Sequence, residues 1–322
     1  MKALVFHTFG GPEVLALQEI PAPSLTSGAV RVRTRAVGLN YADIYRRRGN
    51  YHLVGEPPYI LGYEGAGEIV EVAPDVTGFQ VGDRIGFADV PHANAEFVIV
   101  PADRAIKLLE GISYEAAASV LLQGLTAHYL VNDSYNVQAG DTVLVHAAAG
   151  GVGQLLIQLS KARGARVVGL TSSPTKRDAA LAVGADEVFL YSSDWVSSVL
   201  AWSQQAEGVD VAYDSVGSTL MDSFKAVRIR GTVVFFGMAG GDPQPVDPRM
   251  LMDTSKTLTG GDLWNHVTSA AERSSRAGSL FTDMLEGRLK VAEPKTFPLA
   301  EGAEAHQYLE SRASTGKILL IP

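Results

Sequence analysis

Cysteine is absent from all 322 residues of the chain. Its absence excludes disulfides, thiolate metal sites and a cysteine nucleophile, and weakly favours a reducing compartment. Long apolar runs are missing as well, since no stretch reaches the ~18 apolar residues of a membrane span. The opening MKALVFHTFGG has no long apolar segment and indicates a strand, not a signal peptide. We therefore expect a cytoplasmic protein without membrane association.

Basic residues are in the minority, with 27 Lys and Arg against 35 Asp and Glu and a net charge of −8. Such a balance disfavours nonspecific binding to nucleic acid or to an anionic membrane. The run Arg46-Arg47-Arg48 is local and short. We interpret it as a solvated face, with an anion contact as the alternative.

Histidines that could form a metal site are also lacking. A catalytic zinc site needs three N, S or O ligands on one cavity wall. The seven histidines are scattered without a close pair, at His7, His52, His92, His128, His146, His266 and His306. The sequence therefore predicts no metal.

The residues that are present divide the chain into two kinds of pattern. Residues 1 to about 120 are β-rich, and AVRVRTRAV (29–37) alternates with period two, as a half-buried strand does. The one early helix is expected over NYADIYRRRG (40–49). Beyond residue 113, strands alternate with helices, and the strands are expected at 141–147, 165–171, 187–191, 209–217, 231–237 and 256–261.

Such alternation predicts a doubly wound parallel α/β sheet of the Rossmann type, with ligands at the carboxyl ends of its strands. After residue 262 we expect a long helix, a short strand near KTFPL, a helix and the strand KILLI. We expect this segment to return to the first domain. The predicted domains are residues 1–122, 123–262 and 263–322.

HAAAGGVGQL (146–155) lies between a strand and a helix, inside a thirty-residue strand–loop–helix–strand unit. This context is what a dinucleotide fingerprint requires, because the glycines admit the pyrophosphate to the helix N-terminus. Ala148 stands where the fingerprint has its first glycine, so the bare pattern is imperfect. The predicted contacts are Ala149, Gly150, Gly151, Val152 and Gly153.

The second strand of this unit indicates which dinucleotide is bound. NAD sites usually have an Asp or Glu there, which binds the ribose 2′-OH. Here the segment GLTSSPTKRD offers hydroxyl groups followed by Lys176 and Arg177. Hydroxyls and two cations suit a 2′-phosphate, so Ser172, Lys176 and Arg177 predict NADPH. The alternative is that the two cations are ordinary exposed helix residues.

The chain resembles the zinc-independent quinone oxidoreductases, the zeta-crystallin group of the medium-chain dehydrogenase/reductase superfamily. The resemblance runs from end to end in family order. The matching pieces are GGPEVL, GLNYADIYRRRG, LGYEGAGEIVEV, GDRI, AAASVLLQGLTAHYLV, VHAAAGGVGQ, YDSVG, FFG and ESRASTGKILLIP.

The resemblance implies a chaperonin-10-like β-rich domain completed by the C-terminal segment, with a Rossmann domain inserted. It also implies reduction of quinones or related enones by NADPH in the interdomain cleft, and a homodimer or tetramer formed through the Rossmann domain. Among the site residues, Asn40 and Tyr45 would contact nicotinamide and substrate, and Thr126 would contact nicotinamide. The implied cofactor contacts are Tyr191, Ser215, Phe236, Gly237 and Lys317.

Some of these roles have structural alternatives. Asp43 is open between a site role and a helix cap, and Lys317 between a cofactor contact and a plain strand start. The aromatic strand ends Tyr191 and Phe236 could equally be core residues.

The sequence departs from the zinc alcohol-dehydrogenase branch. Where that branch has Gly-His-Glu, this chain has Gly62-Tyr63-Glu64. Alcohol oxidation then lacks its usual Lewis acid, whereas hydride delivery to an electron-poor quinone needs one less. Two alternatives stay open. One is a 2-enoyl-CoA or 2-alkenal reductase, and the other is a non-catalytic NADPH-binding structural or RNA-binding protein.

Overall fold

Two units make up the part of the chain that the computed structural model describes, residues 1–192 and 194–322. Unit 1 contains Met1–Leu125 and Thr268–Pro322, and unit 2 contains Thr126–Val267. The unit boundaries fall a few residues beyond those expected from the sequence.

Unit 1 is built around the long strand β3 (Ala29–Leu39), whose first half alternates between buried and more exposed side chains. Its seven-stranded sheet has the order β15-β16-β3-β5-β6-β8, with β7 also paired to β3, and a smaller sheet has the order β2-β1-β4. The other strands are β1 (Lys2–Phe6), β2 (Ala16–Glu19), β4 (Tyr59–Ile60), β5 (Glu64–Val72), β6 (Arg84–Ala88), β7 (Phe97–Pro101), β8 (Ile106–Lys107), β15 (Lys295–Pro298) and β16 (Ile318–Ile321).

The helices of unit 1 come from both ends of the chain. They are α1 (Tyr41–Arg47), α9 (Ala270–Leu285) and α10 (Gly302–Glu310), with the 3-10 turns η1 (Pro12–Val14), η2 (Ala102–Arg104) and η5 (Leu299–Glu301). The helix α2 (Tyr114–Tyr129) begins in unit 1 and ends in unit 2.

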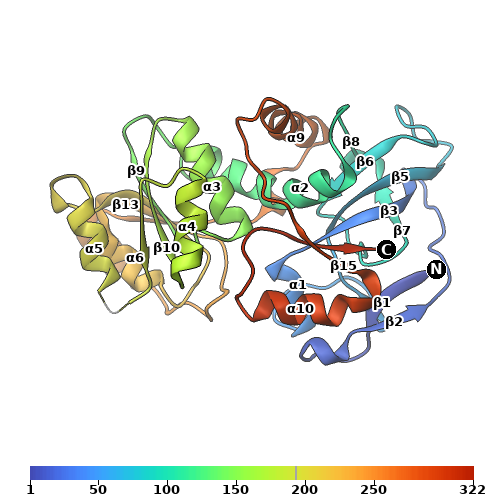
Figure 1. The fold of residues 1–322 in the computed structure, drawn as a ribbon, viewed down its shortest axis with the longest axis horizontal. Helices are drawn as coiled ribbons and strands as arrows, with labels where there is room; N and C mark the ends of the chain where they lie inside the picture. The colour runs from blue at the N-terminus through green and yellow to red at the C-terminus, as the bar shows by residue number, and fades with distance from the viewer. Residues whose placement is uncertain (193) are drawn as a thin grey trace. The chain divides into compact units, whose positions relative to one another are not determined.

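The C-terminal segment completes the sheet of unit 1. β16 pairs antiparallel with β3, so that Ile318 lies opposite Leu39, and β15 then pairs parallel with β16. Figure 1 shows these red strands beside the blue N-terminal ones. The segment also adds Leu299, Ala305, Ile318 and Leu320 to the apolar core of this unit. A strand that ends the chain thus helps to fix the position of Asn40, which follows β3 directly.

Unit 2 is a six-stranded parallel sheet with the order β11-β10-β9-β12-β13-β14. Counted along the chain this is 3-2-1-4-5-6, the order of the doubly wound dinucleotide-binding fold, and it confirms the predicted fold class. The strands are β9 (Thr142–Val145), β10 (Arg166–Thr171), β11 (Glu187–Leu190), β12 (Val209–Asp214), β13 (Val227–Phe235) and β14 (Thr257–Gly260).

Helices cover both faces of the parallel sheet, with α3 and α4 on one face and α5 and α6 on the other (Figure 1). They are α3 (Gly151–Ala162), α4 (Pro174–Ala182), α5 (Trp195–Trp202), α6 (Leu220–Ala226), α7 (Pro248–Thr254) and α8 (Leu263–His266), with the turns η3 (Leu130–Ser134) and η4 (Gln204–Ala206). All four residues of β9 are buried, as expected for a central strand covered on both faces. The winding reverses between β9 and β12, which is where such folds bind ligands.

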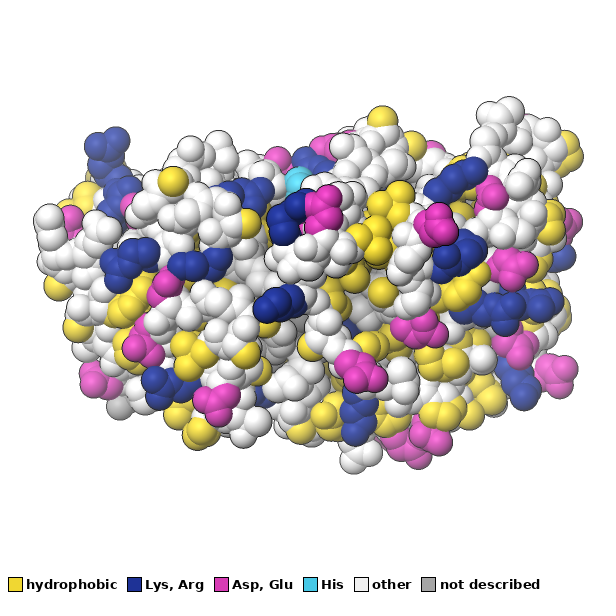
Figure 2. Space-filling model, turned by 45° about the horizontal axis from the view of Figure 1, so that its top comes forward, with side chains coloured by type: hydrophobic (Ala, Val, Ile, Leu, Met, Phe, Trp, Pro, Cys, Tyr) yellow, Lys and Arg dark blue, Asp and Glu magenta, His cyan; other side chains and the backbone are white. Residues whose placement is uncertain are grey.

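Charges of both signs are mixed over the face drawn in Figure 2. On the sheet of unit 1, for example, Arg31 pairs with Glu71 and Arg35 with Glu68. Among residues 1–192 and 194–322, no helix combines the length and the apolar character that crossing a membrane requires.

Candidate active site

The glycine turn of unit 2 joins β9 to α3. Ala147 adopts a left-handed backbone with φ +47°, and its carbonyl oxygen accepts the N–H of Gly150 at 2.8 Å. A Cβ on Gly153 would lie 2.5 Å from that oxygen and 2.9 Å from the Cα of Ala148, so only glycine lets α3 start this close to the turn. Ala148 itself is not in the left-handed region, which explains why the first glycine of the fingerprint is dispensable here.

The same turn has the features that an anionic group needs. The N-cap Gly150 carries no side chain, and the first turn of α3 contains no acidic residue. Unpaired N–H groups and the partial positive charge of the helix end are thus left for a phosphate. The turn therefore fits the pyrophosphate of a dinucleotide.

The end of β10 carries hydroxyls and cations but no carboxylate. Ser172 is exposed, and Ser173 caps α4 by accepting the N–H of Lys176 at 3.4 Å. Arg177 lies in the first turn of α4, 48% exposed, and pairs with Glu187 at 3.2 Å. Ser172, Lys176 and Arg177 thus lie in the segment that follows β10, where Arg177 is paired with the carboxylate of Glu187.

The remaining predicted cofactor residues of unit 2 lie at the carboxyl ends of neighbouring strands. Ser215 follows β12, and Phe236 and Gly237 follow β13. A Cβ on Gly237 would lie 3.1 Å from the carbonyl oxygen of Ser215, so these two strand ends are close. Tyr191 follows β11, and its hydroxyl reaches back to His146 and to the N–H of Ala147.

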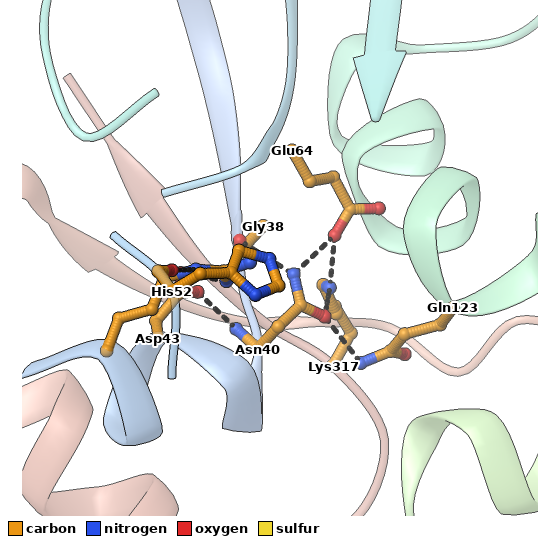
Figure 3. Close-up of polar contacts among 8 residues, drawn as sticks. Gly38, Asn40, Asp43, His52, Glu64, Gln123 and Lys317 are labelled. Carbon is orange, nitrogen blue, oxygen red and sulfur yellow. Dashed lines mark hydrogen bonds and ion pairs between the residues drawn. The ribbon is translucent and has the colours of Figure 1, made fainter. Parts of the chain in front are cut away.

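In unit 1, a buried polar cluster surrounds Asn40 (Figure 3). The ammonium of Lys317 contacts Glu64 Oε2 at 2.5 Å and Asn40 Oδ1 at 2.8 Å. Glu64 also accepts Asn40 Nδ2 at 2.9 Å and the N–H of Leu122 at 2.7 Å. Gln123 Nε2 reaches Asn40 Oδ1 at 3.3 Å. The cluster thus joins β5, the end of β3, α2 and the start of β16.

Asn40 has used its hydrogen-bonding capacity inside this cluster. Its Nδ2 donates to the carbonyl oxygen of Gly38 and to Glu64, and its Oδ1 accepts from Lys317 and Gln123. An amide has two donors and two acceptor positions, so all four are occupied. The side chain is therefore held rigidly in one orientation.

The structure gives different settings to three further predicted residues. Lys317 is 3% exposed and directed at Glu64, and Thr126 is half-buried on α2. Asp43 accepts the N–H of Asn40 at 2.9 Å and so closes the first turn of α1. Burial raises the pKa of Asp43, and the Arg46 guanidinium opposes that rise.

Tyr45 belongs to a group of aromatic side chains around α1. Its ring centroid lies 6.0 Å from that of Tyr41 and 6.4 Å from that of Tyr51. The Arg46 guanidinium lies over Tyr63, 3.5 Å from its ring centroid, and 4.9 Å from that of Tyr51. Tyr45 is half-buried.

The interpretation of Arg46-Arg47-Arg48 as a solvated face was wrong for Arg46 and Arg47, whereas the side chain of Arg48 is 54% exposed. Arg46 is 2% exposed and Arg47 is fully buried. Arg47 donates to the carbonyl oxygen of Gly10 and contacts His306 at 2.9 Å and Glu310 at 2.7 Å. These partners lie far away in the sequence, so a local charge pattern could not indicate them.

The residues of unit 1 do not fit a zinc ion. Glu64 is occupied by Lys317, Asn40 and a backbone N–H, and Tyr63 lies under the Arg46 guanidinium. Lys317 and Arg46 already place two positive charges here, and these would repel a zinc ion. Across residues 1–192 and 194–322, no group of three or more His, Asp or Glu side chains is arranged to hold a metal ion.

Sequence reasoning gave no role to Glu64, His146 or Asp214. Glu64 was noted only as the last residue of Gly62-Tyr63-Glu64, and its partner Lys317 is 253 positions away. The sequence did contain one signal, because Glu64 stands in the largely apolar and glycine-rich segment LGYEGAGEIV. A Glu that is buried in such a strand is rare unless it is paired.

Two family models match the chain. The alcohol dehydrogenase GroES-like domain matches residues 26–133, and the zinc-binding dehydrogenase family matches residues 151–273. The first match lies mainly in unit 1 and the second mainly in unit 2.

Known proteins resemble the chain over its whole length. The quinone oxidoreductase of Pseudomonas aeruginosa is 38% identical, with 100% of this chain and 99% of that protein covered. A 2-haloacrylate reductase of a Burkholderia species is 36% identical, with the same coverage. The crystal structure of Escherichia coli quinone oxidoreductase complexed with NADPH superimposes with a TM-score of 0.96 at 34% identity and covers 100% of both chains. The chain therefore belongs to the quinone oxidoreductase family of the medium-chain dehydrogenase/reductase superfamily.

Proposed function

We propose that the protein is an NADPH-dependent reductase of quinones and of related electron-poor enones. The observation that carries the proposal is the carboxylate-free end of β10, where Ser172, Lys176 and Arg177 follow the strand next to the glycine turn. Full-length relatives named quinone oxidoreductase, and a related structure solved with NADPH, support it.

Unit 2 binds the dinucleotide in this proposal. The N–H groups at the start of α3 bind the pyrophosphate, because Gly150, Gly151 and Gly153 leave the backbone uncovered. Ser172, Lys176 and Arg177 bind the 2′-phosphate through charge-assisted hydrogen bonds. The bound NADPH supplies a hydride from its nicotinamide ring. Its remaining contacts are Ala149, Val152, Tyr191, Ser215, Phe236 and Gly237.

Unit 1 orients the electron acceptor, and Thr126 contacts the nicotinamide. Asn40 is held rigidly by four hydrogen bonds and contacts the acceptor through its fixed side chain. Lys317 places a positive charge next to Asn40. A contact of Lys317 with the dinucleotide stays a prediction. Tyr45 offers a hydroxyl to the acceptor oxygen that becomes negative. A quinone spreads this charge over a conjugated ring, so orientation by weak donors suffices and water protonates the product.

The proposal is tested by NADPH oxidation with a para-quinone, an ortho-quinone, an enone and an enoyl-CoA. We expect turnover with the quinones and the enone, and binding of NADPH without any acceptor. NADPH binding without turnover on any acceptor would favour the non-catalytic alternative. Absence of NADPH binding would refute the proposal.

Reduction of an activated alkene is a second candidate, favoured by the 36% identity to a 2-haloacrylate reductase. This reaction needs a proton at the α-carbon after hydride has reached the β-carbon. A CoA ester is less favoured, because Arg46 and Arg47 are buried and engaged and cannot bind its phosphates. Turnover of 2-haloacrylate without turnover of quinones would select this candidate.

We further propose a homodimer through unit 2. β14 is the end strand of the parallel sheet, and its outer edge has no strand partner in the part of the chain that the structure describes. Leu258 of β14 is 36% exposed, and Met252 of α7 and Ile229 of β13 are 72% and 69% exposed. An unpaired edge with exposed apolar side chains suits a second copy of the chain. Sedimentation of the protein and of Ile229→Lys tests this, and monomers in both would refute it.

The cytoplasmic location stays a prediction.

A further inference from the structure

Behind the glycine turn of unit 2, four side chains form a continuous line of hydrogen bonds. Tyr191 Oη lies 3.0 Å from His146 Nδ1, His146 Nε2 lies 2.9 Å from Ser223 Oγ, and Ser223 Oγ lies 2.7 Å from Asp214 Oδ2. His146, Ser223 and Asp214 are at most 1% exposed. At the other end, the backbone N–H of Ala147 reaches Tyr191 Oη at 3.1 Å.

The Asp214 end fixes the direction of every proton in this line. Burial opposes ionisation of Asp214, but its carboxylate accepts hydrogen bonds from Ser223, Thr219 and the N–H of Gly217, and these hold its pKa below the ordinary value. Ser223 Oγ has two neighbours that can only accept, the Asp214 carboxylate at 2.7 Å and the carbonyl oxygen of Thr219 at 3.2 Å, so its single proton is donated to one of them. His146 Nε2 must then donate to Ser223.

The tautomer of His146 follows from this direction. Burial lowers the pKa of His146, so the ring is neutral and has one donor and one acceptor. With Nε2 as the donor, Nδ1 accepts the hydroxyl proton of Tyr191. The hydroxyl oxygen of Tyr191 is then ready to accept the N–H of Ala147. Every donor along the line has an acceptor.

Ala147 is the residue on which the turn depends. Its backbone is left-handed, an uncommon state for alanine, and its carbonyl oxygen accepts the N–H of Gly150 and lies where a Cβ on Gly153 would clash with it. The line of hydrogen bonds holds the N–H of Ala147, and the N–H of Gly150 holds the carbonyl oxygen of Ala147. The ends of β9, β11 and β12 thus jointly fix the shape of the turn.

We propose that His146 is a positioning residue for the dinucleotide, which acts through Tyr191 to hold the Ala147 peptide and so sets the turn that receives the pyrophosphate. This inference rests on the proposed function, because it assumes that the turn binds NADPH. Ser223 and Asp214 are its supports. His146 itself does not contact the ligand. The hydroxyl of Tyr191 accepts the N–H of Ala147 and so supports the turn.

Fluorescence titration of the acceptor-free protein with NADPH tests the proposal. Tyr191→Phe and His146→Leu should each raise Kd about ten-fold, which corresponds to roughly 1.4 kcal/mol. The double variant should bind no more weakly than His146→Leu, because both changes remove the same support. Ser223→Ala should weaken binding, and Ser223→Thr, which keeps the hydroxyl, should restore it. For His146→Leu, kcat at saturating NADPH should change little.

Tyr213→Phe is the matched control. It removes another buried tyrosine hydroxyl from unit 2, one that donates to the carbonyl oxygen of Leu130 at 3.2 Å. We expect it to lower stability in urea unfolding but to leave the Kd of NADPH unchanged. Additive effects of Tyr191→Phe and His146→Leu, or a wild-type Kd in both, would overturn the inference. If the wild-type protein does not bind NADPH, the proposed function itself is refuted.

Discussion

The ammonium of Lys317 lies 2.5 Å from the carboxylate of Glu64, and 253 positions of sequence separate the two residues. Their side chains are 2% and 0% exposed, so neither charge faces water. Burying two ions is costly, and their attraction offsets that cost only when good geometry and further hydrogen bonds are present. Asn40 provides such bonds to both ions. The pair therefore couples the start of β16 to β5 and holds Asn40 in place.

Lys317→Met should lower the free energy of unfolding by about 3–5 kcal/mol, because it leaves the Glu64 carboxylate buried without its cation. Lys317→Met combined with Glu64→Gln should recover most of the loss, since a neutral amide replaces the charge. Urea unfolding measures both. Lys107→Met is the control, because Lys107 is 56% exposed in its pair with Asp83 and should change stability by less than about 1 kcal/mol. Equal losses in both lysine variants would contradict this account.

The dinucleotide preference should depend on the start of α4. We expect NADPH to bind at least about ten-fold more tightly than NADH, a difference of roughly 1.4 kcal/mol. Lys176→Ala with Arg177→Ala should remove most of that preference by weakening NADPH binding and leaving NADH binding nearly unchanged. Titration with both dinucleotides measures it. A double variant with the full NADPH preference would show that this strand end does not bind the 2′-phosphate.

Lys161→Ala is a suitable control for that experiment. Lys161 lies at the far end of α3 and pairs with Asp186 at 2.7 Å, away from the strand ends. It changes the charge of unit 2 without touching the predicted 2′-phosphate site. The NADPH preference should therefore persist in this variant.

The parallel sheet of unit 2 was predictable because its signals are local. Each strand is a short apolar run next to a helical pattern, and the glycine turn has fixed spacing after β9. The return of the chain to unit 1 was accessible through the resemblance, and β16 pairs with β3 accordingly. Nothing in the residue pattern alone specifies such a long-range pairing.

The contacts inside the site were not predictable in the same way. The resemblance predicts that Asn40 contacts nicotinamide and substrate, but nothing in the residue pattern indicates that Gly38, Glu64, Gln123 and Lys317 occupy all four of its hydrogen-bonding positions. The role of His146 depends on Tyr191, Asp214 and Ser223, which come from three other elements. Such networks form only when segments distant in the sequence meet in the fold, so periodicity and spacing cannot predict them.

Tyr45→Phe should lower kcat with a quinone by less than ~30-fold, since obligatory acid catalysis is usually worth about 10²–10⁴-fold and lost orientation costs less. Tyr41→Phe, a change on the neighbouring residue of the same aromatic group, is the control and should have a smaller effect. The measurement is steady-state NADPH oxidation across pH. A loss of about 10³ or more, with the alkaline limb removed, would make Tyr45 a general acid and favour alkene reduction.

Gly153→Ala and Gly278→Ala should change stability in opposite directions. A Cβ at Gly153 meets the carbonyl oxygen of Ala147 at 2.5 Å, so the turn must shift, and we expect weaker NADPH binding and lower stability. A Cβ at Gly278 meets nothing within 4 Å and lies inside α9, so alanine should stabilise the helix by about 0.5–1 kcal/mol. NADPH titration and urea unfolding measure both variants. Unchanged NADPH binding in Gly153→Ala would contradict the assignment of the turn.

Stability should fall with acidification, and His306 should account for part of the fall. Burial, assisted by the Arg47 guanidinium, lowers the pKa of His306 from 6.5 to about 3. The unfolded chain therefore binds a proton below 6.5 that the folded chain excludes. The contribution of His306 to the free energy of unfolding is complete above the unfolded pKa and is lost toward the folded one, at about 1.4 kcal/mol per pH unit.

His306→Gln, which keeps an acceptor for Arg47, should flatten the slope of unfolding free energy by this amount between about pH 6 and pH 4. Above about pH 7 the ring is neutral in both states, so the difference between the two proteins should stop changing there. An equal slope in both proteins between about pH 6 and pH 4 would show that His306 takes up its proton in the folded state as well.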